Sequence, residues 1–278
     1  EPTISHSLAS RTMAFDIATG GWSLAVLDLA GVDPEKFATP RPSGEAIGTV
    51  PDSFADGLGL PKGVVVSTGG HDQPAGALGA GILSSGEAMY ATGTVDCICP
   101  IFDKPPKAEE AIANNLCIYP SCVAPLFCSI AFNFTGGSLL KWYRDNFASE
   151  ESAIAQRTGE DVYDVICGEV SENPEHIFLL PHFTVTGTPY FDTQSSGVIA
   201  GLSLDTKRED IVSAILSGVT YEMKLNLELL ASAGVKIDRL RASGGGAKSP
   251  IWVQRKADIL GVPIGVLEVS EAPALGVA

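Results

Sequence analysis

The sequence predicts an α/β protein, and three stretches of the chain support this. The apolar run VVVST at 64–68 indicates a buried strand; it ends in a glycine pair, and QPAGALGAGIL at 73–83 then indicates a helix of small residues. Residues 239–260 repeat the order of strand, glycine turn and helix. The longest predicted helix runs from Lys207 to about Ser232. In such folds, polar residues that follow a strand lie at the crevice beyond the strand ends.

The residues before 64 predict smaller elements. Residues 8–22 indicate a helix and a turn, 23–32 a short amphipathic helix followed by a loop to about residue 44, and 46–50 a short strand.

The remaining elements follow in order after residue 84. The predicted elements are two strands around a turn at 92–94 (87–99), a loop (103–115), a helix after a glycine pair (133–147), a strand with a Gly/Pro-rich excursion (176–192), a strand (263–269) and the start of a helix (271–278). Most of one row on the long helix is expected to be a core stripe; the row comprises Ile211, Ile215, Gly218, Glu222, Leu225 and Leu229.

Composition limits the classes of function. The chain has 278 residues, of which 45% are hydrophobic and 18% charged, so it is long and apolar enough for a globular core. Its net charge of −15 argues against nucleic acid or an anionic membrane as a partner. An anionic substrate remains compatible with this charge, because backbone N–H groups can bind it.

Six cysteines are too few for a disulfide scaffold in a chain this long, and five of them lie between 97 and 128. No zinc-type spacing follows Cys97-x-Cys99, so we expect buried thiols and no metal ligands. The first residues, EPTISHSLASR, show no apolar signal segment, and no run approaches the roughly 20 apolar residues of a membrane span. We therefore expect a cytoplasmic protein.

The segment GGHDQPAGALGAG at 69–81 places Asp72 where an α/β fold would hold a ligand. Three further glycine turns, at 93–94, 136–137 and 244–246, have the form that binds phosphate near a helix N-terminus. Neither the GxxxxGK[ST] phosphate loop nor the GxGxxG dinucleotide motif is present. The residues alone thus indicate glycine-lined clefts suited to a nucleotide, and they disfavour an NAD-dependent oxidoreductase.

The ordered set of motifs resembles the FGGY family of carbohydrate kinases, within the actin-like, sugar-kinase and Hsp70 ATPase superfamily. The segments that carry the resemblance are LASRTMAFDIATGGWS, PSGEAIGTV, GGHDQPAGALGAG, ATGT, GGSLLKWYRD, FLLPHFTVTGTPY, GVIAGLSL, ILSGVTYEMKLNLELL, SGGGAKSPIWVQRKADILGVPI and EAPALGVA. The resemblance implies an actin-like (ribonuclease H-like) ATPase fold, with ATP and Mg²⁺ as cofactors and a sugar or polyol as substrate.

On the sugar side, the resemblance makes Asp72 the general base that removes the proton from the sugar hydroxyl; the alternative is a helix-capping Asp. Gln73 resembles a polar substrate contact, with a capping or turn role equally open. His71 is expected to serve the turn or to support the site indirectly.

On the nucleotide side, Gly93 and Thr94 resemble the phosphate loop of the C-terminal domain. The sequence has GTVD where GTSG is commoner, so Val95 and Asp96 are expected near the phosphates. A carboxylate there would repel ATP unless Mg²⁺ intervenes or the side chain turns away.

Five further residues are assigned to nucleotide binding by the same resemblance. Gly137 and Lys141 resemble positions that line the nucleotide pocket, although Lys141 is also compatible with a solvated helix lysine. Gly245, Gly246 and Ala247 resemble the turn against which adenosine lies, with a simple strand–helix turn as the alternative.

The chain departs from the family pattern at both ends. The first strand and its D-x-G-T-type phosphate loop are missing before Glu1, and the last helix is unfinished. We interpret residues 1–80 as the closing part of the sugar-binding domain and 81–278 as most of the nucleotide-binding domain. This chain alone is expected to be weakly active or inactive, and a catalytically inactive nucleotide-binding fragment is the alternative function. The segments are most similar to xylulokinase-like members, and a homodimer is compatible with the family.

Overall fold

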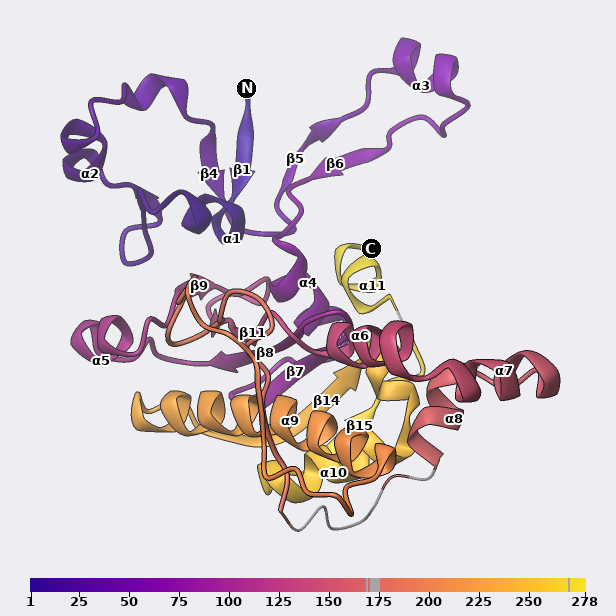
Figure 1. Ribbon diagram of the computed structural model, residues 1–278. Helices are drawn as coiled ribbons and strands as arrows, with labels where there is room; N and C mark the ends of the chain where they lie inside the picture. Colours follow the sequence, from indigo (N-terminus) through magenta and orange to yellow (C-terminus); the bar gives the residue numbers. More distant parts are fainter. Residues whose placement is uncertain (169, 171–175, 270) are drawn as a thin grey trace.

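The computed structural model describes residues 1–168, 170, 176–269 and 271–278 (Figure 1). Its strands are β1 (Thr3–Ser5), β2 (Phe15–Asp16), β3 (Gly21–Trp22), β4 (Thr39–Arg41), β5 (Ala46–Thr49), β6 (Val65–Ser67), β7 (Gly86–Thr92), β8 (Asp96–Phe102), β9 (Ile118–Pro120), β10 (Phe127–Ser129), β11 (Ala131–Asn133), β12 (Phe178–Leu180), β13 (Val198–Ala200), β14 (Ile237–Ser243) and β15 (Ile264–Val266).

Its α-helices are α1 (His6–Ala9), α2 (Leu24–Leu29), α3 (Asp52–Leu58), α4 (Asp72–Gly79), α5 (Ala108–Ala113), α6 (Gly137–Phe147), α7 (Ser149–Thr158), α8 (Val162–Gly168), α9 (Arg208–Ser232), α10 (Pro250–Leu260) and α11 (Ala272–Val277). Short 3₁₀ helices are η1 (Ser10–Thr12), η2 (Pro34–Lys36) and η3 (Gly245–Lys248).

A mixed sheet forms the centre of the molecule. Within the described residues it has seven strands, in the order β15-β14-β7-β8-β10-β9, with β11 also paired to β8. β14 runs parallel to β7 and β15, whereas β7 and β8 form the antiparallel pair expected around the turn at 92–94. The strand–turn–helix order expected for 239–260 is confirmed as β14, η3 and α10.

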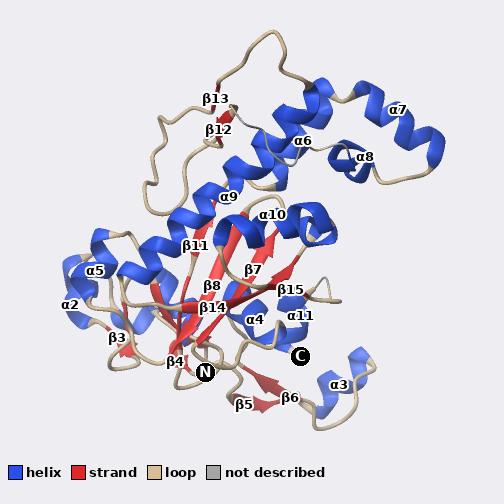
Figure 2. Cartoon of the chain, turned by 90° about the horizontal axis from the view of Figure 1, so that it is seen from below, coloured by secondary structure: helices blue, strands red, loops and turns tan. Residues whose placement is uncertain are grey.

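Helices cover both faces of this sheet (Figure 2). Alternate residues of a strand point to opposite faces, so Tyr90 and Ile98 pack toward α9 and α10, and Met89 packs toward α4. Cys97 and Cys99 flank Ile98 and belong to the α4 face. This alternation explains why the Cys-x-Cys pair is part of the core.

The other cysteines only partly match the expectation of buried thiols. Cys128 and Cys167 are buried, but Cys122 is half-buried and Cys117 is exposed. Cys117 lies in the connection between α5 and β9, outside the sheet.

The small residues of α4 allow a very close approach of α11. A Cβ atom on Gly79 would lie 1.9 Å from the carbonyl oxygen of Ala272, and one on Gly276 would lie 1.8 Å from that of Ala75. The expected helix of small residues after the glycine pair is therefore confirmed, and the two helix backbones are in direct contact.

The strand at 64–68 is not buried, contrary to the expectation. Among the described residues β6 pairs only with β5, and this two-stranded hairpin with α3 at its tip projects from the body (Figure 1). Val65 is 61% exposed and Val66 is 40% exposed. Apolar β-branched residues satisfied the sequence pattern for a strand, but no layer covers them in the described part of this chain.

Two other expectations also need correction. Residues 103–115 contain helix α5 and are not only a loop, because Ala108–Ala113 is an alanine- and glutamate-rich stretch that favours helix. In residues 8–22, α1 and η1 are followed by the β2–β3 hairpin, so the segment contains strands as well as helix and turn.

The long helix α9 is where expected, but its buried face is rotated from the predicted stripe. Ile215 and Gly218 of that stripe are buried, whereas Ile211, Glu222, Leu225 and Leu229 are only half-buried. The buried side chains of its C-terminal half are Met223, Asn226, Leu227 and Leu230. The first half is buried on most sides, because α6, α8 and β12 pack around it.

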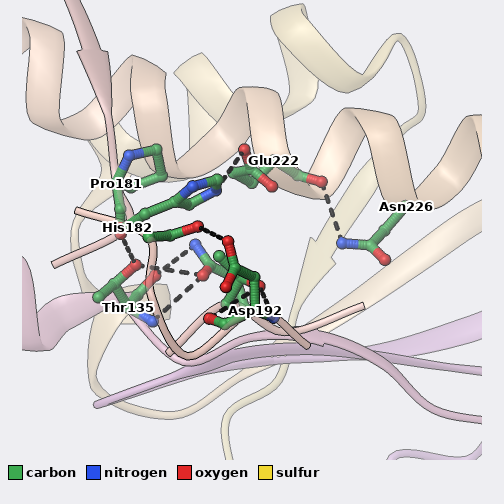
Figure 3. Close-up of polar contacts among 9 residues, drawn as sticks. Thr135, Pro181, His182, Asp192, Glu222 and Asn226 are labelled. Carbon is green, nitrogen blue, oxygen red and sulfur yellow. Dashed lines mark hydrogen bonds and ion pairs between the residues drawn. The ribbon is translucent and has the colours of Figure 1, made fainter. Parts of the chain in front are cut away.

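Polar contacts hold the segment after β12, and one of them reaches α9 (Figure 3). His182 and Glu222 point toward one another, with 3.0 Å between Nε2 and Oε1. Thr135 donates a hydrogen bond to the carbonyl oxygen of Pro181. Asn226 Nδ2 donates to the carbonyl oxygen of Glu222 at 3.0 Å. Glu222, predicted as part of a core stripe, thus serves a polar contact.

Candidate functional site

Helix α4 begins at Asp72, the predicted catalytic residue. The Asp72 side chain is 68% exposed, and its Oδ1 accepts a hydrogen bond from the Gln73 amide at 2.7 Å. His71 is the N-cap residue, and its backbone amide donates to Ser7 Oγ at 3.0 Å. The turn is thereby tied to α1, which leaves the carboxylate accessible at the helix start.

His71 lies beside that carboxylate, with 3.3 Å between its Nδ1 and Asp72 Oδ1. Its ring stacks on Tyr119 at 6.3 Å between centroids, and Arg11 hydrogen-bonds the Tyr119 hydroxyl. Burial lowers the pKa of His71; the Asp72 charge opposes this shift and Arg11 adds to it. Sequence analysis missed Arg11 and Tyr119, which lie 108 positions apart and join only in the fold.

Gln73 has a buried hydrogen-bond acceptor that is unsatisfied among the described residues. Its Oε1 is buried and, among the described residues, has no hydrogen-bond partner. Buried polar atoms are nearly always hydrogen-bonded, so this oxygen is suited to receive a donor from a bound molecule.

A cavity of about 330 Å³ lies close to the same turn. His6, Thr19, Ser43 and Cys122 are among its lining residues. A Cβ on Gly70 would lie 2.6 Å from Cys122 Sγ and 3.6 Å from Ser43 Oγ, so these two residues connect the cavity to the 69–72 segment. A larger cavity of about 1210 Å³ has Tyr221 and Gln254 in its lining, on α9 and α10, and none of the predicted site residues line it.

The turn at 93–95 packs directly on the start of α6. Gly137 and Gly136 donate their amides to the carbonyl oxygens of Gly93 (2.7 Å) and Thr94 (3.0 Å). A Cβ on Gly137 would lie 2.7 Å from the Gly93 oxygen, which explains the glycine there. The fold thus brings together two of the predicted glycine turns, and it uses the Gly136 and Gly137 amides to do so.

Asp96 does not face the phosphate loop, contrary to the expectation. It is fully buried, and Lys256 Nζ lies 2.7 Å from its Oδ2. In β8 the side chain at 96 points to the same face as that of Ile98, toward α10. The carboxylate that was expected to repel ATP is therefore turned away and compensated by a lysine.

The third glycine turn links β14 to α10. Gly244 has a φ of 98°, in the left-handed region, and a Cβ there would lie 2.5 Å from the Thr92 carbonyl oxygen. Gly245 is exposed, Gly246 is half-buried, and Ala247 is buried in the core below the turn. Gly245 and Gly246 therefore present a surface with little side chain.

Lys141 lies on the exposed side of α6. Its Nζ pairs with Asp145 Oδ2 at 2.5 Å, one helical turn later, and the side chain is 61% exposed. This arrangement fits the solvated helix lysine that the sequence left open.

Within the described residues, no group of three or more His, Cys, Asp or Glu side chains is arranged to hold a metal ion. Nor does any helix of this described part combine the length and apolar character needed to cross a membrane.

Family comparison agrees with the fold. The N-terminal-domain model of the FGGY family of carbohydrate kinases matches residues 1–79, and the C-terminal-domain model of that family matches residues 88–278. The chain belongs to the FGGY family of carbohydrate kinases.

Individual relatives lie in the same family. An autoinducer-2 kinase from Yersinia pestis (strain Pestoides F) is 29% identical across the whole chain, which covers 53% of that protein. The chain thus spans about half the length of the curated relatives it matches.

Solved structures of kinases share its architecture. A xyloylose kinase from Brucella ovis superposes with a TM-score of 0.86 at 25% identity, over 100% of this chain and 55% of that one. A xylulose kinase from Rhodospirillum rubrum gives 0.86 at 26% identity, over 99% and 54%. The actin-like α/β fold expected from the motifs is confirmed.

Proposed function

We propose that this protein is an ATP-dependent carbohydrate kinase that transfers the γ-phosphate of ATP to a hydroxyl of a sugar or polyol, with Asp72 as the general base. The observation that carries the proposal is the exposed Asp72 carboxylate at the start of α4, in a chain of the FGGY family. Phosphoryl transfer requires mainly positioning and electrostatics, and a base near the attacking hydroxyl adds about 10²–10⁴-fold.

The surroundings of Asp72 support a role for the adjacent groups in binding substrate. Gln73 Oε1 is buried without a partner among the described residues, so a substrate hydroxyl that donates to it would satisfy it. His71 Nδ1, 3.3 Å from Asp72 Oδ1, helps to orient the carboxylate.

For the nucleotide, we assign the turn at Gly93-Thr94 to phosphate and the turn at Gly245, Gly246 and Ala247 to adenosine, with the two glycines forming its surface and Ala247 buried beneath them. The close packing of Gly93 on Gly137 supports a shared nucleotide surface. With no acidic cluster among the described residues, Mg²⁺ is expected to arrive with the ATP phosphates, as it does in many kinases. Bound there, the ion would neutralise phosphate charge.

The test is ADP release with MgATP and a panel that includes xylulose, gluconate, glycerol and autoinducer-2, the last because of the Yersinia relative. Turnover that needs one of these acceptors and falls at least 100-fold in Asp72→Asn supports the proposal. Asp52→Asn is the matched control, because Asp52 is likewise exposed at the first position of a helix, α3. Full activity in Asp72→Asn would remove Asp72 from the role of base.

A nucleotide-binding chain without turnover is the second candidate. The engagement of the Gly136 and Gly137 amides by the 93–94 carbonyl groups favours it, because those donors are then unavailable to stabilise a phosphate during transfer, whereas the Gly245–Gly246 surface remains open to adenosine. Binding of MgATP with no ADP release for any acceptor would support it, and acceptor-dependent turnover would exclude it.

A further inference from the structure

We propose that Lys256 and Asp96 are positioning residues for the nucleotide site: their buried ion pair holds the three glycine turns in register. The inference rests on the proposed function, because it concerns the turns assigned there to ATP. Neither residue is expected to touch the nucleotide, since Asp96 is 0% exposed and Lys256 1% exposed.

The pair is enclosed by polar and aromatic partners. Lys256 Nζ lies 2.7 Å from Asp96 Oδ2 and donates to Thr92 Oγ1 at 2.5 Å. Tyr90 donates its hydroxyl to the same carboxylate oxygen at 2.7 Å. The ammonium also lies over the rings of Tyr90 (4.4 Å) and Trp252 (4.2 Å).

Three members of this cluster, Asp96, Thr92 and Trp252, abut the glycine turns. Asp96 follows the 93–95 turn directly, and a Cβ on Gly136 would lie 2.7 Å from Asp96 Oδ1. A Cβ on Gly246 would lie 2.4 Å from Thr92 Oγ1, the atom that Lys256 binds. The cluster therefore joins β7, β8, the start of α6 and the β14–α10 turn beneath the predicted nucleotide surface.

Stability alone is a poor explanation for such a pair. Burial lowers the pKa of Lys256 and disfavours its charge, and the nearby Asp96 carboxylate opposes that shift. A buried pair is often no more stable than apolar residues of the same volume, whereas removal of one partner is strongly unfavourable. What the pair adds is a fixed geometry, because its short contacts tie together two groups that lie 160 positions apart in the sequence.

The experiment uses the 278-residue chain and three variants: Asp96→Asn, Lys256→Met and the double variant. Each substitution nearly preserves side-chain volume. The control is Lys236→Met/Asp238→Asn, which removes an ion pair of similar length (2.9 Å) that is exposed to solvent beside the start of β14. Three quantities are measured: the urea unfolding midpoint, the Kd for MgADP, and amide hydrogen exchange of peptides covering 92–96, 136–138 and 244–247.

We expect the single variants to unfold at lower urea, because each leaves one buried charge unpaired. The double variant should regain the wild-type midpoint but keep an MgADP Kd at least tenfold weaker. It should also keep at least tenfold faster exchange in the three turns. The control should match wild type in all three measurements.

Recovery of Kd and exchange together with the midpoint in the double variant would overturn the inference, because the pair would then be structural only. Single variants that fold and keep the wild-type Kd and exchange rates would also overturn the inference. If the single variants do not fold, the result for the double variant is used instead. If wild type fails to bind MgADP, the proposed function is wrong and the nucleotide part of the inference falls with it. Unchanged exchange in the turns overturns the inference alone.

Discussion

Glycine sets the distance between α4 and α11, the helix that packs on it, and a single substitution at Gly79, the last residue of α4, tests this. In Gly79→Ala, the new methyl group would lie 1.9 Å from the Ala272 carbonyl oxygen and 2.7 Å from the Gly276 nitrogen. Contacts between non-bonded heavy atoms are ordinarily about 3.5 Å, so the two helices must separate by more than about 1 Å. Backbone atoms, unlike a flexible side chain, cannot rotate away.

Two terms set the size of the effect. Overpacking of this kind typically costs about 1–3 kcal/mol, and the exchange of glycine for alanine inside a helix returns up to about 1 kcal/mol. Gly57→Ala isolates the second term, because Gly57 lies within α3 and a methyl group added there would meet no heavy atom within 4 Å among the described residues. We therefore expect Gly57→Ala to stabilise slightly and Gly79→Ala to destabilise.

The measurement is urea unfolding followed by circular dichroism for wild type and both variants. A Gly79→Ala variant at least as stable as Gly57→Ala would refute the packing argument. Because α4 begins with Asp72, Gly79→Ala should also lower any kinase activity, whereas Gly57→Ala should not.

Three other predictions concern charge, core and polar contacts. Burial lowers the pKa values of His6 and His71 below 6.5, so the unfolded state binds more protons than the folded state near these pKa values. The free energy of unfolding should therefore fall as the pH drops from about 7 to 5. Urea titrations at several pH values test this, and greater stability at pH 5 would contradict it. Ile215→Ala should cost about 2–5 kcal/mol, since Ile215 is fully buried between α9 and its neighbours, and a loss under about 1 kcal/mol in thermal and urea unfolding would argue against that packing. Glu222→Ala leaves the His182 imidazole without this partner and should cost about 1–3 kcal/mol, whereas Glu222→Gln, which keeps a hydrogen-bond acceptor, should cost less; equal losses would show that the contact contributes nothing specific.

The order of local elements followed from the sequence because its signals are short-range. Glycine turns, small-residue periodicity and apolar runs predicted α4, the β7–β8 pair and the β14–α10 unit near their observed bounds. The ordered motifs also predicted the family and the actin-like fold, which the comparisons confirm. The assignment of Asp72 as base remains a prediction.

Solvent exposure was harder to predict, because it depends on what packs against an element. The run at 64–68 has the composition of a buried strand, yet in the described part of the chain β6 pairs with β5 alone and is exposed. On α9 the expected stripe is displaced in the C-terminal half, where Met223, Leu227 and Leu230 pack against the sheet instead. The first half is buried on most sides, because α6, α8 and β12 pack around it.

The sequence by itself determined the strand–turn–helix units, the three glycine turns and the family. Tertiary structure alone decided that Asp96 turns inward to Lys256, that the Gly93 and Gly137 turns share hydrogen bonds, and that His71 lies between Asp72 and Tyr119. The physical reason is the separation along the sequence of the residues that interact. A turn or a helix depends on neighbours a few positions away, whereas the charge and burial of a side chain depend on groups that only the folded chain brings within about 3–4 Å.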